Sequence, residues 1–269
     1  MPRFQLGEND SIYYEHDPPT AQQGLTFTFF NALTGDVDMW KAEIVPALRK
    51  AGHGTFLYNM RGQRDSPFSP GLDINADQIV ADAVALLKEA APGRPVMVGL
   101  SIGGLFAIQA IQQGIQAEGL VLVNTLRRDG PRLQWINEAL VRMVEVGGME
   151  LMRDINFPLI FNEEWLGQNR KDFLKDTGYA PLDSQSGTYK LLASGRTANW
   201  DVPYEKLTLP VLVMTGMRDH IFYQSEVVDE LTARLPNATR LDVPNAGHMV
   251  PLERPRVFID ALLDMAKRI

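Results

Sequence analysis

The stretch Gly99-Leu100-Ser101-Ile102-Gly103 has the form Gly-x-Ser-x-Gly, and it decides how the rest of the chain is interpreted. An apolar run, 95–98, precedes it, and a helix-like run, 104–110, follows it. A strand, a sharp turn and a helix are the setting of a nucleophile elbow, where flanking glycines relieve the crowding around a strained serine. The pattern therefore predicts that Ser101 presents its hydroxyl as a nucleophile. A glycine-rich turn with a capping serine is the structural alternative.

A nucleophilic serine needs a base, and the base needs an acid that orients it. His248 lies in a loop directly after the strand-like run 239–243, where a histidine can reach over the nucleophile. Asp219 follows another buried-strand pattern, 210–214, and is the expected acid, which would fix the histidine tautomer. A solvated loop histidine and a surface pair between Asp219 and Arg218 are the structural alternatives.

The other histidines of the chain are expected to be structural. His220 is adjacent to Asp219, and because neighbouring side chains diverge, it is a poor base for that acid. His53 belongs to a turn that ends a helix, and His16 lies in an N-terminal hairpin region.

With these residues identified, the chain resembles the α/β-hydrolase superfamily over nearly all of its length. Within that superfamily it is most similar to the 3-oxoadipate enol-lactonase and carboxylesterase branch. The superfamily order of serine, acid and histidine is that of Ser101, Asp219 and His248. The similarity also rests on the loop 30–36 with the following Met39-Trp40, the loop 60–67, the run 119–125 and the loop 246–255.

The resemblance implies an α/β-hydrolase fold, which is a mostly parallel eight-stranded sheet covered by helices, with a helical cap inserted after strand six. Residues 1–126 and 205–269 would form the core, and residues 127–204 would form the cap. Strand patterns that alternate with helix patterns also predict a parallel sheet covered on both faces.

Individual elements are predicted from periodicity and from turn residues. The expected strands before the elbow lie at 25–30 and 55–59, and the expected helices at 40–51 and 77–91. In the segment 127–204 we expect several short helical pieces, with breaks at Gly147-Gly148, Pro158, Gly167, Gly178 and Pro181.

The loop after the strand at 25–30 is expected to supply part of an oxyanion hole. The resemblance assigns the two donors to the backbone N–H groups of Leu33 and Ile102, and Asn31 is expected to shape this loop or to contact the substrate. This loop is a variant of the family's pattern. Gln63-Arg64-Asp65 is a second departure, because the family has His-Gly-x there.

Substrate contacts are expected from the segment 127–204. Trp135, Phe161 and Trp165 are the apolar candidates, although aromatic residues at helical spacing more often pack in a core. Arginines of this segment could face a carboxylate, as an oxoadipate lactone would require, or could simply be solvated: Arg127, Arg128, Arg132 and Arg196.

Composition narrows the remaining classes of function. The net charge of −7 argues against nucleic acid or an anionic membrane as a partner, and the chain has no cysteine for disulfides or thiolate chemistry. We infer no metal and no cofactor, because the acidic loop residues lack metal-ligand spacing and the dinucleotide fingerprint is incomplete. The N-terminus lacks a signal-peptide pattern, so we expect a cytoplasmic enzyme that is a monomer or a homodimer.

These observations predict a serine hydrolase that cleaves a carboxylic ester or a lactone, including an enol-lactone, through an acyl-enzyme. Another enzyme could use the same residues, namely a C–C bond hydrolase, a perhydrolase or a cofactor-free oxygenase. A third alternative is a non-catalytic receptor that keeps the scaffold, because fold alone does not determine function.

Overall fold

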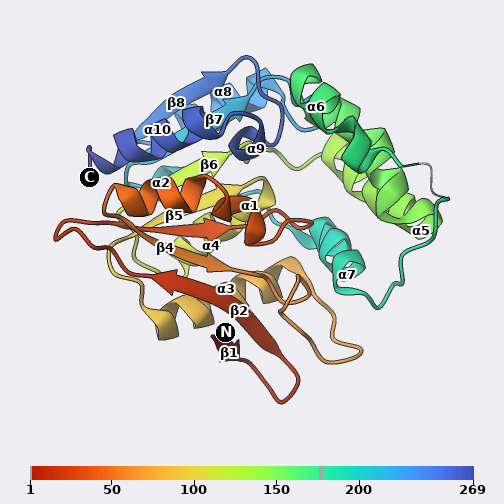
Figure 1. Ribbon diagram of the computed structural model, residues 1–269, viewed down its shortest axis with the longest axis horizontal. Helices are drawn as coiled ribbons and strands as arrows, with labels where there is room; N and C mark the ends of the chain where they lie inside the picture. The colour runs from red at the N-terminus through yellow and green to blue at the C-terminus, as the bar shows by residue number, and fades with distance from the viewer. Residues whose placement is uncertain (1, 176–177) are drawn as a thin grey trace.

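The computed structural model describes residues 2–175 and 178–269 and is built around a single eight-stranded sheet (Figure 1). Its strands are β1 Arg3–Gln5, β2 Ser11–Asp17, β3 Thr26–Phe30, β4 Gly54–Tyr58, β5 Pro95–Leu100, β6 Gly119–Val123, β7 Val211–Gly216 and β8 Ala238–Val243. Their order is β1-β2-β4-β3-β5-β6-β7-β8, with antiparallel pairing at β1–β2 and β2–β4 and parallel pairing elsewhere. The mostly parallel eight-stranded sheet is therefore confirmed.

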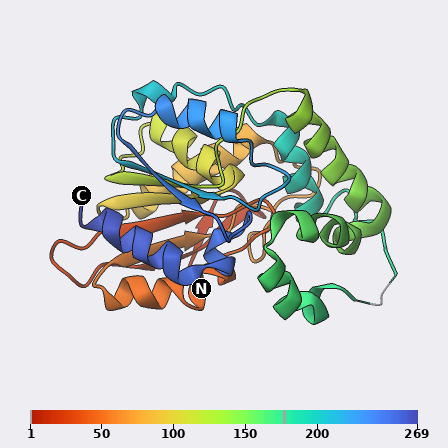
Figure 2. The same ribbon diagram turned by 90° about the horizontal axis from the view of Figure 1, so that it is seen from above.

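Helices cover both faces of this sheet, as Figure 2 shows. One face carries α1 Asp38–Lys41, α2 Ile44–Lys50 and α10 Pro255–Ala266, and the other carries α3 Ala76–Ala90, α4 Ile102–Gln112 and α8 Ser225–Ala233. Successive residues of β5 divide between these layers, since Met97 packs on the α3–α4 side while Val96 and Val98 pack on the α2–α10 side. Burial on both faces explains why the central strands are almost continuously apolar.

The expected helix at 40–51 is two helices, α1 and α2, in the structure. Pro46 lies in the first turn of α2 and has no N–H to donate to the carbonyl of Ala42, so the chain bends between the two pieces. Elsewhere the expected strands and the helix at 77–91 agree with β3, β4 and α3 to within one residue at each end.

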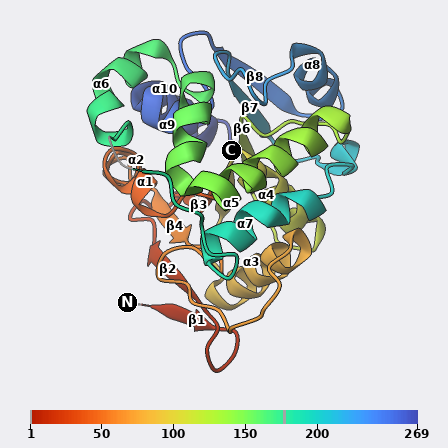
Figure 3. The same cartoon turned by 90° about the vertical axis from the view of Figure 1, so that its right-hand side faces the viewer.

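The segment between β6 and β7 folds into helices that lie together at one end of the sheet (Figures 1 and 3). They are α5 Pro131–Ile160, α6 Glu163–Phe173 and α7 Gly187–Ser194, followed by the short 3-10 turns η1 Gly195–Thr197 and η2 Tyr204–Lys206. The helix α9, Val250–Glu253, lies close to them after β8. The division of the chain into a core and a cap at residues 127 and 204 stays a prediction.

The expected breaks at Pro158 and Gly167 are wrong. Pro158 lies in the last turn of α5, where its missing N–H costs a single hydrogen bond, and Gly167 lies inside α6. The expected break at Gly147-Gly148 is confirmed as a kink, because Gly148 takes the non-helical values φ 68° and ψ −161° and divides α5 into two helical pieces. A Cβ at Gly148 would lie 2.3 Å from the carbonyl oxygen of Ala180, so the kink lets the chain after α6 pass close to the helix.

In the ranges 2–175 and 178–269, no helix combines the length and the apolar character that a membrane span requires.

Candidate active site

Ser101 lies in the turn between β5 and α4, and its backbone is in an uncommon conformation. Its φ is 59° and its ψ is −129°, a positive-φ geometry that a non-glycine residue adopts at a cost. A Cβ at Gly99 would lie 2.2 Å from the Cα of Gly104, and a Cβ at Gly104 would lie 2.1 Å from Oγ1 of Thr125. Gly99 therefore lets β5 meet the backbone of α4, and Gly104 leaves room for the Thr125 side chain, which together hold Ser101 at the strand end.

His248 and Asp219 are joined by a short contact. Nδ1 of His248 lies 2.6 Å from Oδ2 of Asp219, and both side chains are buried. Oδ1 of Asp219 accepts the backbone N–H groups of Ile221 at 3.1 Å and Phe222 at 2.9 Å. Burial by itself would raise the pKa of Asp219, but His248, the Phe222 N–H and the Arg127 guanidinium together lower it below its usual value. Asp219 is therefore held as a carboxylate that faces the imidazole.

Asn124, at the end of β6, ties the segments that carry this pair. Its Oδ1 accepts the N–H of Gly216 at 2.7 Å, and its Nδ2 donates to the carbonyl of Gly247 at 3.2 Å. The first bond reaches the end of β7, and the second reaches the residue before His248. Because β5 to β8 run parallel, Ser101, Asn124, Asp219 and His248 all follow carboxyl ends of strands, which is the edge where ligands bind in open α/β sheets.

Arg127 is buried next to Ser101, whereas most arginines in proteins are exposed to solvent. Its Nη2 donates to Oγ of Ser101 at 2.6 Å, and the residue is only 8% exposed. The guanidinium lies 3.9 Å from the ring centre of Phe222 and 5.1 Å from that of Trp200. Burial lowers the pKa of Arg127 to about 10, so it remains a cation at neutral pH. The candidate nucleophile thus has a buried positive charge as its hydrogen-bond donor.

The loop that follows β3 is fixed by Gln63. Nε2 of Gln63 donates to the carbonyl oxygens of Ala32 at 2.8 Å and Leu33 at 3.3 Å. The N–H of Leu33 belongs to the same trans peptide as the Ala32 carbonyl and points the opposite way, so Gln63 sets its direction. Ile102, the other expected donor, is the first residue of α4, where backbone N–H groups have no partner within the helix.

Asn31 is fully engaged inside the protein. Its Nδ2 donates to the Tyr58 carbonyl at 2.9 Å and to Gln63 at 3.1 Å, and its Oδ1 accepts Nε1 of Trp40 at 2.8 Å. These bonds hold its side chain against β4, Gln63 and Trp40, and contact of Asn31 with the substrate stays a prediction.

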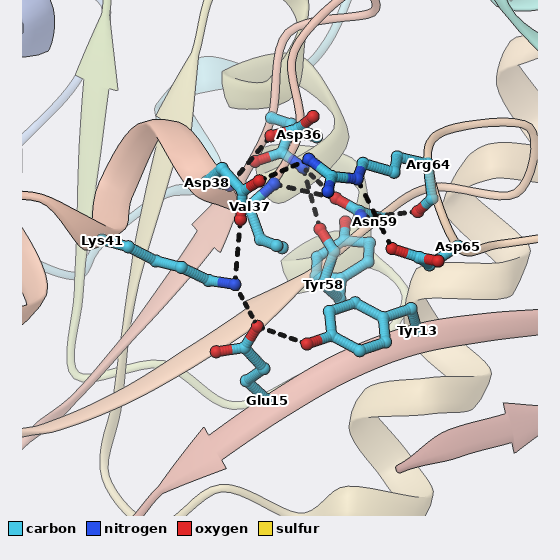
Figure 4. Close-up of polar contacts among 11 residues, drawn as sticks. Tyr13, Glu15, Asp36, Val37, Asp38, Lys41, Tyr58, Asn59, Arg64 and Asp65 are labelled. Atoms are coloured by element: carbon cyan, nitrogen blue, oxygen red, sulfur yellow. Dashed lines mark hydrogen bonds and ion pairs between the residues drawn. The ribbon is translucent and has the colours of Figure 1, made fainter. Parts of the chain in front are cut away.

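A polar network anchors the far end of the same loop (Figure 4). Oδ1 of Asn59 accepts the N–H of Val37 at 2.9 Å, and Lys41 forms ion pairs with Glu15 at 2.5 Å and with Asp38 at 3.0 Å. The segment 31–38 is thus held at its start by the bond from Asn31 to Tyr58 of β4. It is held at its end by Asn59 and, through Lys41, by Glu15 of β2. The backbone of Leu33 lies within this anchored segment.

The loop that carries His248 is held by a buried glutamate, Glu253, which is 5% exposed. Its carboxylate accepts the backbone N–H groups of Asn162 at 2.7 Å, Gly247 at 2.9 Å and Met249 at 3.0 Å. The N–H of His248 itself donates to the Ile160 carbonyl at 2.6 Å. One carboxylate therefore joins the histidine loop to the connection between α5 and α6.

We expect Glu253→Gln to destabilise the protein by about 1–3 kcal/mol and to lower kcat, because one acceptor oxygen becomes an NH₂ group that faces backbone donors. Urea unfolding and steady-state kinetics measure the two effects. Glu164→Gln is the matched control, since Glu164 has a 61% exposed side chain that pairs with Arg254. Equal stabilities of the two variants would show that Glu253 does not hold the loop.

The aromatic residues expected to contact substrate lie in two different places. Trp135 is 79% exposed and borders an open groove of about 510 Å³, with Leu159 and His220 among the other lining residues. Phe161 and Trp165 stack on each other with ring centres 3.8 Å apart, within a cluster between α5 and α6. Substrate contact by these residues stays a prediction.

Gln63 and Glu253 were not among the expected site residues, and Arg127 was only one of several candidate arginines. Gln63 had one sequence signal, because it stands where the loop departs from the family's pattern. Arg127 had another, because it follows the strand end at Asn124-Thr125. Glu253 had no signal beyond its place in the histidine loop. In the part of the chain that the structure describes, no group of at least three His, Cys, Asp or Glu side chains is arranged to hold a metal ion.

Comparison with known proteins supports the same architecture. A Variovorax paradoxus (strain S110) protein with the provisional name carbamate hydrolase RutD is 22% identical and covers 96% of this chain and 97% of its own. The enol-lactonase from Burkholderia xenovorans LB400 matches with a TM-score of 0.78 at 21% identity, over 98% of both chains. A thermophilic esterase from Thermogutta terrifontis, with malate bound, matches with a TM-score of 0.80 at 20% identity, over 100% of this chain and 99% of its own.

At these identities the solved structures show a shared fold and nothing more. The family model for the alpha/beta hydrolase family, however, matches residues 29–261, which is most of the chain. The resemblance seen in the sequence is thus confirmed at the level of the superfamily, and the chain belongs to the alpha/beta hydrolase family.

Proposed function

We propose that this protein is a serine hydrolase that cleaves a carboxylic ester or a lactone, with Ser101 as nucleophile, His248 as base and Asp219 as the acid that orients it. The observation that carries the proposal is the 2.6 Å contact between His248 Nδ1 and a buried Asp219, at the sheet edge where Ser101 occupies its strained turn. The contact leaves Nε2 of His248 for the serine. The hydrolase names of the relatives support the same reaction class.

In the proposed cycle, Nε2 of His248 takes the hydroxyl proton while Oγ of Ser101 attacks the carbonyl carbon. The carbonyl oxygen becomes an oxyanion that accepts the N–H groups of Leu33 and Ile102. The intermediate then breaks its bond to the leaving oxygen, which receives the proton from His248. Water attacks the acyl-enzyme in the same way and releases the acid.

The bond from Arg127 to Ser101 is compatible with this cycle. A hydroxyl has one proton to donate and two lone pairs that accept. Arg127 uses a lone pair of Oγ, so the proton stays available to His248.

We expect Asp219→Asn to lower kcat by about 10³- to 10⁴-fold, less than the loss of the serine or the histidine. An amide NH₂ that faces Nδ1 favours the tautomer with its proton on Nε2, and that tautomer cannot take the serine proton. Steady-state kinetics with a chromogenic ester measure the loss. Asp229→Asn, at an exposed ion pair with Arg240, is the control and should keep full activity. A loss below tenfold for Asp219→Asn would place the acid elsewhere.

The reaction class is tested with a substrate panel containing simple esters, lactones, a carbamate ester and a vinylogous diketone. The proposal expects hydrolysis of an ester or a lactone at a rate that depends on Ser101. Faster cleavage of the diketone would identify a C–C bond hydrolase instead. Stabilisation of the protein by a ligand without any turnover of the panel would favour a receptor.

A further inference from the structure

We propose that Arg127 binds a carboxylate of the substrate next to Ser101, so that the protein prefers esters of short dicarboxylic acids with one free carboxylate. The free carboxylate would lie on the acyl side, a short spacer away from the carbonyl that is attacked. This inference rests on the proposed function, because it names the substrate class of the same site.

The first argument is that Arg127 is a buried cation without a carboxylate partner in the described part of the chain. Buried charges in proteins are normally paired, since desolvation is costly. The charge of Asp219 raises the pKa of Arg127, but both oxygens of Asp219 already have partners. Its Oδ2 contacts His248, and its Oδ1 accepts two backbone N–H groups. The donor bond of Arg127 goes to the neutral hydroxyl of Ser101 instead. A substrate carboxylate would supply the ion-pair partner that Arg127 lacks.

Arg61 shows how this same chain buries an arginine for structural purposes. Its exposure, 7%, is close to the 8% of Arg127. Nε of Arg61 donates to Oδ2 of Asp82 at 2.8 Å, and its Nη2 donates to Oδ1 of the same carboxylate. Both nitrogens on one edge of that guanidinium thus hold one carboxylate, which is the strongest arrangement for this pair.

The corresponding edge of Arg127, formed by Nε and Nη2, holds no carboxylate of the described residues. Its Nη2 contacts Oγ of Ser101, and its Nε is buried with no hydrogen-bond partner among the described residues. A substrate carboxylate can therefore take this edge as Asp82 takes the edge of Arg61. Because Oγ must at the same time reach the scissile carbonyl, only a short spacer fits between the two groups.

The surroundings strengthen such an ion pair. The rings of Phe222 and Trp200 flank the guanidinium and keep water from it, and Coulomb attraction is stronger where the local dielectric constant is low. The chain as a whole carries a net charge of −7, which repels anions at long range. A buried local cation is thus the feature through which this protein can still select an anionic substrate.

The test compares monomethyl succinate with methyl succinamate, in which a neutral amide replaces the carboxylate. We expect wild-type kcat/KM to be at least about tenfold higher for the anion, the effect of one charge-assisted hydrogen bond. Arg127→Met should remove this preference, so that the kcat/KM values for the two esters lie within about threefold of each other whatever the overall activity of the variant. Arg128→Met, at the neighbouring exposed pair with Glu230, is the control and should keep the preference.

A second measurement uses the wild-type protein alone. Malonate should slow the labelling of Ser101 by a fluorophosphonate, and malonamide should not. Equal protection by both compounds, or an equal loss with both esters in Arg127→Met, would overturn the inference and leave the proposed function in place. Failure of the fluorophosphonate to label wild-type Ser101 at all would overturn the proposed function and this inference together.

Discussion

Ser101→Ala is expected to lower kcat/KM for the best ester by roughly 10⁴- to 10⁶-fold while the protein stays folded. Without Oγ no acyl-enzyme forms, and only binding and the oxyanion donors remain to assist attack by water. Alanine carries a Cβ as serine does, so the substitution adds no new steric penalty at φ 59° and the turn should persist. The measurement is steady-state kinetics on the purified variant, with circular dichroism and thermal unfolding to show that it is folded.

Ser194→Ala is the matched control for this change. Ser194 is also buried, but its hydroxyl donates to the Leu191 carbonyl within α7. Its removal should affect stability slightly and turnover by less than about threefold. If Ser101→Ala kept more than a tenth of wild-type activity, the chemistry would not pass through this serine.

His248→Ala is expected to have the second-largest effect, a loss of about 10⁴- to 10⁶-fold in kcat. The serine hydroxyl is a weak nucleophile at neutral pH unless a neighbouring base takes its proton. The carboxylate of Asp219 is a poor substitute for the imidazole, because backbone N–H groups occupy its Oδ1 and its lowered pKa makes it a weak base. Single-turnover kinetics should show that acylation is the step that is lost.

His220→Ala is the control for the histidine, because His220 is exposed and adjacent to the same acid. We expect it to keep activity within about threefold of the wild type. A large loss in His220→Ala combined with an active His248→Ala variant would reverse the assignment of the base.

The sheet and the order of its elements along the chain could be predicted because each element has a local sequence pattern. Strands such as β5 and β6 are buried on both faces and are therefore continuous apolar runs between turn residues. The turn at Ser101 is equally local, since the glycines it requires lie within a few residues of it. Asp219 could be proposed because it follows such a strand, β7, and His248 because it lies in the loop after the edge strand β8. Their 2.6 Å contact joins two segments that the parallel sheet brings together.

The features that escaped prediction depend on packing between distant segments. Whether Arg127 is solvated or buried is decided by Phe222 and Trp200, which lie far along the chain. The role of Glu253 likewise requires the connection between α5 and α6 to pass over the histidine loop.

The central claim is that Ser101 is an activated nucleophile, and covalent labelling with a fluorophosphonate tests it most directly. Intact-mass analysis with peptide mapping should find one adduct per chain, on Ser101, that His248→Ala abolishes. No adduct on the folded wild-type protein, or an adduct on another residue, would contradict the account.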